Sequence, residues 1–507
     1  MLALEIFLAA LVFMGALPLI AGAFQYGLAS VHCLRRRSHP EGDLYPRVAV
    51  VIPAWNEAAV IGRTLDQLAR LEYPRERLRI YVVDDASTDA TPELLRAKAK
   101  QYPGLVWALR REHGGEGKAH TINHGLREIC AEGWYQAVMV IDADVIFTTS
   151  SLRRMARHLA DPKVGAATAY IKEGSRPANY MNRFIAYEYI TAQAAARRGL
   201  NVLGVQACLA GGAQLIRRES LEAVGGEIDT STLAEDTVTT FRIQLAGKRV
   251  VFEPHATVWA EEPRGVDGLW KQRLRWARGN IQVTRMFSHV WLRPRRKGGG
   301  EQAGKGGGGG GGLGRVSFAL IWFSVLLMPV FLVCASTGLI ALFFIDRAFA
   351  THVFKGLWAI NVVVYLFITL SSFSIDPSTA RRCWLQGIAF PGAVSLLVML
   401  YTVAPTAFVS DGSALLRDLG AHPTATLGTA LTLFAYAWLT LAMVAAAAIR
   451  QIERRRSLAW LAAPLVYLVG YGPLQCAITA TAYIKQLRGA EMRWDKTEKV
   501  GAVGELA

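Results

Sequence analysis

The sequence predicts an α/β domain with a Rossmann-like, mostly parallel sheet, joined to an α-helical transmembrane bundle. Two patterns lead to this fold class. Between Arg47 and about Ser175, short β-prone apolar runs alternate with helix-like segments, which is typical of a parallel, doubly wound sheet. Before and after this region lie apolar runs that exceed the ~20 residues needed to cross a bilayer.

The first apolar run predicts an N-terminal transmembrane helix over residues 1–34. Met1 to Val31 carries one charge, Glu5, and lacks the basic start of a cleaved signal peptide, so a retained anchor is expected. Three arginines, Arg35 to Arg37, follow it. The positive-inside rule therefore predicts a multi-pass protein of the inner (plasma) membrane whose next domain is cytoplasmic.

Composition narrows the classes of partner. The chain has 507 residues, of which 52% are hydrophobic, and a net charge of +16. Its basic clusters at 35–37, 293–297 and 450–456 lie beside apolar runs, which favours anionic lipid headgroups and a pyrophosphate substrate over nucleic acid. Six scattered cysteines without a C-x-x-C pair indicate buried free thiols in a reducing compartment, and neither a zinc site nor a disulfide framework.

The α/β region can be divided into elements in chain order. Strands are expected at 48–53, 78–83, 105–109 and 137–141, and helices at 57–71, 91–100, 118–132 and 151–160. Ligands of such sheets bind beyond the carboxyl ends of the strands. Polar or acidic residues follow three of these strands: Asn56 and Glu57, Asp84 and Asp85, and Asp142 and Asp144. A binding site is therefore expected at this edge.

Asp142 and Asp144 are candidate metal ligands. Their oxygens suit Mg²⁺ or Mn²⁺, which bind few protein carboxylates and take other ligands from water and nucleotide phosphates. The Gly114-Gly115-Glu116-Gly117-Lys118 segment is not a phosphate-binding P-loop, because Glu112 stands where a glycine is required and Ala119 where Ser or Thr is required. Lys118 remains a candidate donor contact, with a solvated helix start as the alternative.

Residues 176–290 are less regular. A helix is expected near 179–198, and the small residues Ala210 to Ala213 suit either a close ligand approach or a plain turn. Glu235 and Asp236 open another helix, where stabilisation of the helix dipole is the simpler explanation.

The last predicted helix of this region lies near 268–286. Trp270, Leu274, Ala277 and Ile281 recur there at helical spacing, with basic residues elsewhere around the axis, which predicts an amphipathic helix at the membrane surface.

A glycine-rich linker at 293–315 separates this domain from the second membrane region, 316–485. About five apolar segments are expected there, near 316–345, 356–374, 386–409, 424–449 and 458–484. Five spans would place the tail, 486–507, outside, although its basic residues favour the inside. One segment is therefore re-entrant or interfacial, and the sequence leaves open which.

Five motifs occur in an order that resembles the membrane-embedded, inverting family 2 glycosyltransferases, which include the synthases of cellulose, chitin, hyaluronan and poly-β-1,6-N-acetylglucosamine. They are Val51 to Glu57, Asp84 to Asp89, Asp142-Ala-Asp144, Glu235-Asp236 and Gln272-Arg-Leu-Arg275-Trp276. The resemblance implies a GT-A type domain over 46–290, and the segment Gly268 to Gly279 is most similar to the poly-N-acetylglucosamine synthases.

The resemblance also implies roles. Asp85 would contact the uridine, and Asp142 and Asp144 would hold the diphosphate through Mg²⁺ or Mn²⁺. Asp236 would be the general base. The remaining implied contacts are Pro53, Glu57 and Lys118 to the donor, and Gln272, Arg275 and Trp276 where acceptor and diphosphate meet. One departure is Ala234, where the family has a threonine before Glu235-Asp236.

The residue types fit this chemistry. An arginine such as Arg275 can neutralise a leaving diphosphate, Trp276 offers a flat face to a sugar ring, and Asp236 can accept the proton of an attacking hydroxyl. The glycosidase alternative, with paired acids, would need neither the sheet nor the basic pair.

The leading hypothesis is therefore a processive synthase that uses UDP-linked N-acetylglucosamine and extends a β-linked polysaccharide through its own spans, with accessory membrane or export subunits left open. The alternatives are transfer of one sugar to a lipid carrier and, from another class, a transporter with a nucleotide-binding domain. Few charges inside the spans argue against an ion pathway.

Overall fold

The computed structural model describes residues 1–34, 44–293, 312–404, 425–490, 499, 501 and 503. The chain forms two compact units. The sheet unit comprises Gly27–Pro263, Arg278–Ala319 and Glu491–Ala507. The helical unit comprises Met1–Tyr26, Arg264–Ala277 and Leu320–Ala490.

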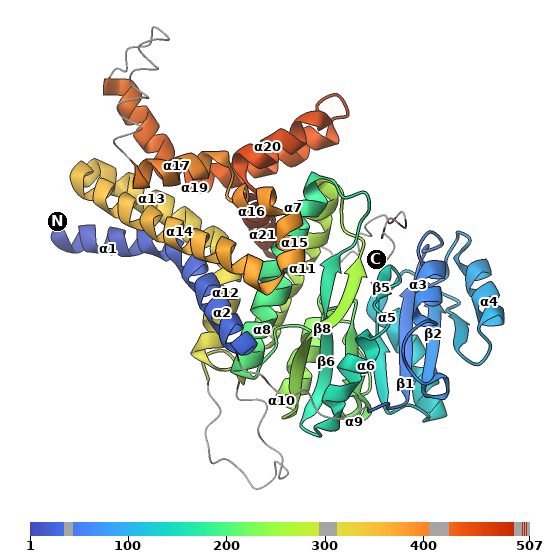
Figure 1. Ribbon diagram of the computed structural model, residues 1–507. Coiled ribbons are helices and arrows are strands. Elements are labelled where there is room, and N and C mark those ends of the chain that lie inside the picture. The colour runs from blue at the N-terminus through green and yellow to red at the C-terminus, as the bar shows by residue number, and fades with distance from the viewer. Residues whose placement is uncertain are drawn as a thin grey trace. The chain divides into compact units, whose positions relative to one another are not determined.

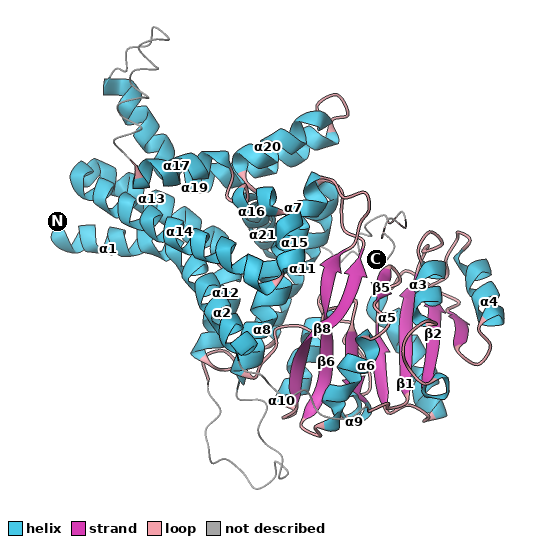
Figure 2. Cartoon of the chain, in the orientation of Figure 1, coloured by secondary structure: helices cyan, strands magenta, loops and turns pink. Residues whose placement is uncertain are grey.

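The sheet unit contains one eight-stranded sheet in the order β3-β2-β1-β4-β7-β6-β8-β5, drawn in magenta in Figure 2. Its strands are β1 Val48–Ala54, β2 Leu78–Asp84, β3 Val106–Arg110, β4 Ala137–Val140, β5 Val145–Phe147, β6 Val164–Glu173, β7 Gln214–Arg217 and β8 Arg249–Ala260. The neighbouring strands from β3 to β4 are parallel, and β6 is parallel to β8. In contrast, β7 is antiparallel to both β4 and β6, and β5 is antiparallel to β8. The predicted α/β fold with a mostly parallel sheet is confirmed.

Helices connect the parallel strands. Between β1 and β4 they are α3 Ile61–Leu68, α4 Thr91–Gln101 and α5 Lys118–Glu132, whereas α6 Ser151–Arg157 lies between β5 and β6, which run in opposite directions. Helix α5 packs closely on the sheet at Gly125, where a Cβ would lie 2.8 Å from Val83 and 3.1 Å from Val51. The helix expected at 57–71 is shorter, because Glu57 to Val60 form a hydrogen-bonded turn that leads into α3.

The later part of the sheet unit holds four further helices. They are α7 Tyr180–Tyr189, α8 Ala196–Leu203, α9 Arg218–Glu222 and α10 Glu235–Leu245. The helix expected at 179–198 is therefore present, but a π-helical turn at Ile190–Ala195 interrupts it. Helix α11 spans Val266–Met286, so its first part belongs to the helical unit and its last turns to the sheet unit.

The helical unit consists mostly of helices, several of them long (Figure 1). Four helices in the described ranges are long and apolar enough to cross a membrane: Leu2–Leu34 (which comprises α1 Leu2–Phe13 and α2 Leu17–Leu34), α13 Met328–Ile345, α14 Arg347–Ile375 and Leu427–Arg454 of α19 (Ala425–Arg454). The run expected at 316–345 is divided into α12 Val316–Leu326 and α13. The run expected near 386–409 contains α16 Trp384–Ile388 and α17 Ala393–Val403, with α15 Pro377–Arg382 before them.

The last apolar run is bent. Ala459–Val469 (α20 is Ala462–Val469) and α21 Tyr471–Leu487 meet at 102°, which makes them one broken span or a re-entrant loop. Gly470 lies at the bend and packs back to back on Gly392, because a Cβ on Gly470 would be 2.5 Å from the Pro391 carbonyl oxygen. If this run is a re-entrant loop, it is the segment that the sequence predicts not to span, which would leave the basic tail on the inside.

Several predictions fall on residues outside the described ranges. These include the basic triplet Arg35 to Arg37, most of the 293–315 linker and most of the 486–507 tail. All six cysteines are free, but they are not uniformly buried, since Cys33 and Cys130 are exposed.

Candidate active site

The Asp142-Ala143-Asp144 segment links β4 to β5 at the carboxyl end of β4. The main chain is fixed there because the Thr64 hydroxyl donates to the Ala143 carbonyl oxygen at 2.7 Å. The two aspartates flank this anchor, one on each side. Parallel pairing places the ends of β1 and β2 at the same edge, since Ala54 is opposite Asp84.

Lys118 joins two of the acidic segments. Its Nζ lies 2.5 Å from Asp142 Oδ1 and 3.4 Å from Glu235 Oε1. The Lys118 side chain is 9% exposed and that of Asp142 37%, so the pair lies at the border between interior and solvent. Burial alone would lower the pKa of Lys118, but the charges of Asp142 and Glu235 raise it above its ordinary value. Lys118 is therefore a permanent cation beside Asp142.

A second lysine, Lys499, forms an ion pair with Asp144. Lys499 Nζ lies 2.7 Å from Asp144 Oδ2 and also donates to the Glu261 carbonyl oxygen. Two residues later, the Gly501 amide donates to Glu261 Oε2 at 3.0 Å. Burial would lower the pKa of Lys499, but Asp144 and Glu262 raise it. A divalent ion on Asp144 would therefore compete with a lysine ammonium.

Asp85 lies directly after β2, in a compact loop. Its amide donates to the Ala54 carbonyl at 2.8 Å, and its carboxylate pairs with Arg111, which also pairs with Glu116. Asp85 Oδ2 accepts from the Gly115 amide at 3.1 Å. These contacts leave the Asp85 carboxylate fixed in place and its charge matched by Arg111.

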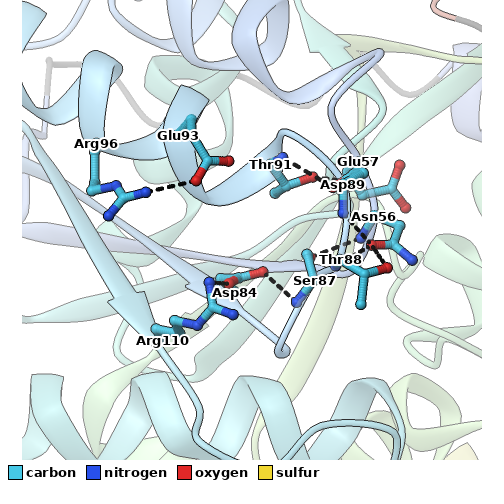
Figure 3. A network of polar contacts seen from close by, with 10 residues as sticks. All are labelled: Asn56, Glu57, Asp84, Ser87, Thr88, Asp89, Thr91, Glu93, Arg96 and Arg110. Carbon is cyan, nitrogen blue, oxygen red and sulfur yellow. Dashed lines mark hydrogen bonds and ion pairs between the residues drawn. The ribbon is translucent and has the colours of Figure 1, made fainter.

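The loops after β1 and β2 form one hydrogen-bonded network (Figure 3). Asn56 Oδ1 accepts from the amides of Thr88 at 2.8 Å and Asp89 at 3.3 Å. Asn56 has a φ of +52°, a left-handed conformation that asparagine tolerates better than most residues. The Glu57 amide donates to Thr91 Oγ1 at 2.9 Å. Asn56 and Glu57 thus brace the Asp84-to-Asp89 loop, and Pro53 lies in β1 opposite Val83.

Asp236 is in the first turn of α10. Its Oδ1 accepts from the Thr237 amide at 2.7 Å. Burial raises the pKa of the Cys208 thiol, and the neighbouring Asp236 carboxylate raises it further, so the thiol stays protonated. The guanidinium of Arg197 donates to Thr168 Oγ1 at 3.2 Å; burial lowers the pKa of Arg197, and the charges of Cys208 and Asp236 act in the opposite direction.

Gly211 marks the point where these side chains converge. A Cβ added there would lie 3.1 Å from Lys118 Nζ, 3.5 Å from Asp236 Oδ2 and 3.6 Å from Asp142 Oδ2. A Cβ at Gly212 would lie 3.7 Å from Asp142 Oδ2. The absence of side chains at both positions keeps space beside the three charged groups.

The Asp142 and Asp144 carboxylates are of the ligand type that a Mg²⁺ or Mn²⁺ ion would take, if a nucleotide diphosphate and water supplied its other ligands. Within the described ranges, no three His, Cys, Asp or Glu side chains form a closed metal cage. These ions need only one or two protein carboxylates when phosphates and water supply the other ligands. Asp142 and Asp144, each already paired with a cation, provide hard oxygens of this kind.

Gln272, Arg275 and Trp276 belong to the helical unit, in the second and third turns of α11. Their spacing of three and four residues places them on one side of this helix. Gln272 is buried, whereas Trp276 is 36% exposed and stacks under Arg273, whose Cζ lies 4.0 Å from the ring centroid. The apolar positions Trp270, Leu274 and Ile281 are buried, but so are Arg273 and Arg278.

The structure brings Lys118, Asp142 and Asp236 together, with Asp144 in the same link as Asp142. Asp85 follows β2, which β1 separates from β4 in the sheet. Sequence reasoning missed Lys499, Arg111, Arg197 and Cys208. Glu235 carried a signal, since it precedes Asp236 in the motif. Lys499 carried none, because a lysine in a charged tail is unremarkable.

Comparison with known proteins shows which family the sheet-containing part of the chain resembles. Residues 46–279 match the sequence model of a family described as "Glycosyltransferase like family 2". The chain is 34% identical to the probable glycosyltransferase YdaM of Bacillus subtilis, over 50% of this chain and 59% of that protein. It is 33% identical to the β-monoglucosyldiacylglycerol synthase of Synechocystis sp., over 47% of this chain and 48% of that protein.

A further relative is the poly-β-1,6-N-acetyl-D-glucosamine synthase of Staphylococcus aureus, which is 27% identical over 54% of this chain and 64% of that protein. The matches thus span about half to two thirds of the length of these relatives.

Among solved structures, a mannosyltransferase of Pyrobaculum calidifontis in complex with GDP-mannose and Mn²⁺ superposes with a TM-score of 0.53 at 23% identity. The match covers 75% of this chain and 99% of that one. This likeness confirms the GT-A type of fold. Residues 46–279 therefore match the model of glycosyltransferase family 2 and have a GT-A type fold, in a chain that also carries several long apolar helices.

Proposed function

We propose that this chain is an inverting, metal-dependent glycosyltransferase that transfers N-acetylglucosamine from its UDP-linked donor to a growing β-linked polysaccharide. In this proposal it is a processive enzyme of the plasma membrane, with a cytoplasmic catalytic domain over 46–290 and spans that carry the product across the bilayer. The observation that supports it best is the convergence of Lys118, Asp142 and Asp236 beside Gly211.

The donor would lie along the carboxyl edge of the sheet. Asp85 is fixed next to the β1 and β2 ends and suits a nucleoside contact, with Pro53 and Glu57 beside it. Lys118 suits a contact to the diphosphate because it is a cation already held at the site. Asp142 and Asp144 would hold Mg²⁺ or Mn²⁺, which would neutralise the charge that develops on the leaving diphosphate.

Transfer then needs one proton acceptor. An acceptor hydroxyl oxygen attacks the anomeric carbon, the bond from that carbon to the diphosphate oxygen breaks, and the hydroxyl proton goes to the Asp236 carboxylate. A single displacement of this kind inverts the anomeric configuration. Arg275 would stabilise the leaving diphosphate, and the exposed face of Trp276, with Gln272, would hold the acceptor sugar.

A second candidate is the transfer of one sugar to a lipid acceptor. It is favoured by the 33% identity to a β-monoglucosyldiacylglycerol synthase, which exceeds the 27% identity to a poly-N-acetylglucosamine synthase. The two functions share the donor site and differ in the product.

The test offers purified chain a panel of UDP- and GDP-sugars with Mn²⁺, measures release of the nucleoside diphosphate, and sizes the product. A polymer formed from UDP-N-acetylglucosamine supports the proposal, whereas a single-sugar lipid supports the second candidate. Asp236→Asn should abolish transfer but not donor binding. Glu128→Gln, at an exposed carboxylate outside the site, should be fully active, and equal activity of both variants would refute the role of Asp236.

A further inference from the structure

The end of α19 holds the start of α11. Glu453, in the last turn of α19, accepts from the first amides of α11: Oε1 from Val266 at 2.9 Å and Oε2 from Asp267 at 2.6 Å. All these residues lie in the helical unit. The first four amides of a helix have no partner within the helix, and a carboxylate is the preferred group at this positive end. Glu453 is therefore an N-terminal cap supplied by another helix.

The residue before α11 is adapted to this cap. A Cβ at Gly265 would lie 2.6 Å from Glu453 Oε1, so any side chain there would push the carboxylate away from the two amides. The close approach depends on a glycine at this position.

A second set of contacts surrounds Asp267. Its Oδ1 accepts from Arg450 Nε at 2.8 Å and from Arg454 Nε at 2.9 Å, both in the last turns of α19. Lys271, one turn along α11, lies 3.1 Å from its Oδ2. Arg450 also stacks on Trp270, with Cζ 5.0 Å from the ring centroid. Arginines near the end of α19 and acids near the start of α11 each match the local helix dipole.

Helix α11 connects its capped first turn to the three proposed site residues on the same helix. Gln272, Arg275 and Trp276 follow Asp267 within three turns of the same continuous helix. At its other end, Gly279 packs so closely on Ala234 that a Cβ there would be 2.6 Å from Ala234 Cβ, and Gln282 Oε1 accepts from the Leu233 amide at 2.9 Å. Glu235 and Asp236 begin directly after these contacts.

We propose that Arg450 and Glu453 are positioning residues for glycosyl transfer: together with Asp267 they fix the axial and rotational position of α11, and hence of Gln272, Arg275 and Trp276. The proposal rests on the function proposed above. In this proposal the long apolar helix α19 holds the start of α11 within the helical unit, and Arg450 and Glu453 act through α11 and not on the substrate. Small displacements of groups that position a substrate are costly, up to ~100-fold in rate for a shift of about 1 Å.

The experiment uses the full-length chain with Glu453→Gln, Arg450→Gln, Arg450→Lys and the control Arg456→Gln. Arg456 is exposed and makes no hydrogen bond or ion pair with a residue that the structure describes. Three quantities are measured: kcat for nucleotide release, the Kd of the donor with Mn²⁺, and the exchange rate of the Val266 and Asp267 amides.

We expect both glutamine variants to lower kcat by about tenfold or more while the donor Kd stays within about twofold, because the donor groups lie in the sheet unit. Arg450→Lys, which keeps the charge opposite Asp267, should recover much of the lost kcat. Amide exchange at Val266 and Asp267 should become roughly tenfold faster in Glu453→Gln.

Unchanged kcat in both glutamine variants would overturn the proposal, as would a parallel loss of kcat and donor binding, which would indicate general damage to the fold. Unchanged amide exchange in Glu453→Gln would refute the cap. If wild type releases no nucleotide from any donor, the proposed function fails instead, and the exchange measurement still tests the cap.

Discussion

Replacement of Lys118 by methionine tests the charged centre of the site. Methionine keeps the apolar stem of the side chain and removes the ammonium that lies 2.5 Å from Asp142 and 3.4 Å from Glu235. The variant then holds Asp142, Glu235 and Asp236 close together without this cation. We expect a less stable domain that binds divalent ions more strongly.

The size of the effect follows from burial. Removing one partner of a fully buried ion pair costs about 3–5 kcal/mol. The Asp142 side chain is 37% exposed, so water screens part of this charge, and we expect a loss of about 2–4 kcal/mol. For a domain of roughly 250 residues, that loss corresponds to a fall in Tm of roughly 4–16 °C.

The assay is thermal unfolding of the full chain, in EDTA and in Mn²⁺, with Lys163→Met as the control at an exposed lysine. Saturation at 100 times Kd adds about 2.7 kcal/mol, so Mn²⁺ should restore most of the lost stability in Lys118→Met. The shift should be smaller in wild type, where Mn²⁺ joins a carboxylate that Lys118 already neutralises. Equal Tm values in EDTA, or equal Mn²⁺ shifts, would refute the reasoning.

Three further predictions concern the surroundings of the site. Lys499→Gln frees Asp144 from its ion pair, so half-saturation with Mn²⁺ should occur at a roughly fivefold lower concentration; an unchanged value would show that Lys499 does not compete. Gly114→Ala would place a Cβ 2.2 Å from the Asp85 carbonyl oxygen, so UDP binding should weaken about tenfold, whereas Gly62→Ala, with ordinary contacts, should bind normally. Burial raises the pKa of Glu173 from 4.5 to about 7, so its stabilising protonated form is lost as pH rises through about 7. Glu173→Gln should therefore raise Tm more at about pH 8.5 than at about pH 5, and an equal gain at both would contradict this pKa.

The parallel half of the fold could be predicted because its signals are local. Each strand from β1 to β4 is a short apolar run followed by polar residues, and chain order alone brings those ends to one edge. The antiparallel strands could not be predicted. β7 has four residues, Gln214–Arg217, and β5 has three, Val145–Phe147, and such short runs carry no usable periodicity.

The site shows the same division. Asp142, Asp144 and Asp236 stand in motifs with a recognisable spacing, whereas Lys499 reaches Asp144 from the far end of the chain through tertiary contacts that no local pattern records. The cap on α11 could not be predicted for the same reason: in the sequence Glu453 is only one more charged residue in the basic segment at the end of α19. Contacts between side chains from distant segments can be identified only in the folded structure.

The most direct test of the account is metal-dependent turnover by Asp144→Asn. Purified wild type and variant are given UDP-N-acetylglucosamine over a range of Mn²⁺ concentrations, and UDP release and Mn²⁺-dependent UDP binding are measured, with Glu128→Gln as the control. We expect UDP release by wild type and the control, and loss of both release and metal-dependent binding in Asp144→Asn. Metal-dependent UDP binding that survives in Asp144→Asn at the wild-type affinity would contradict the central claim that this aspartate holds the donor through a metal ion.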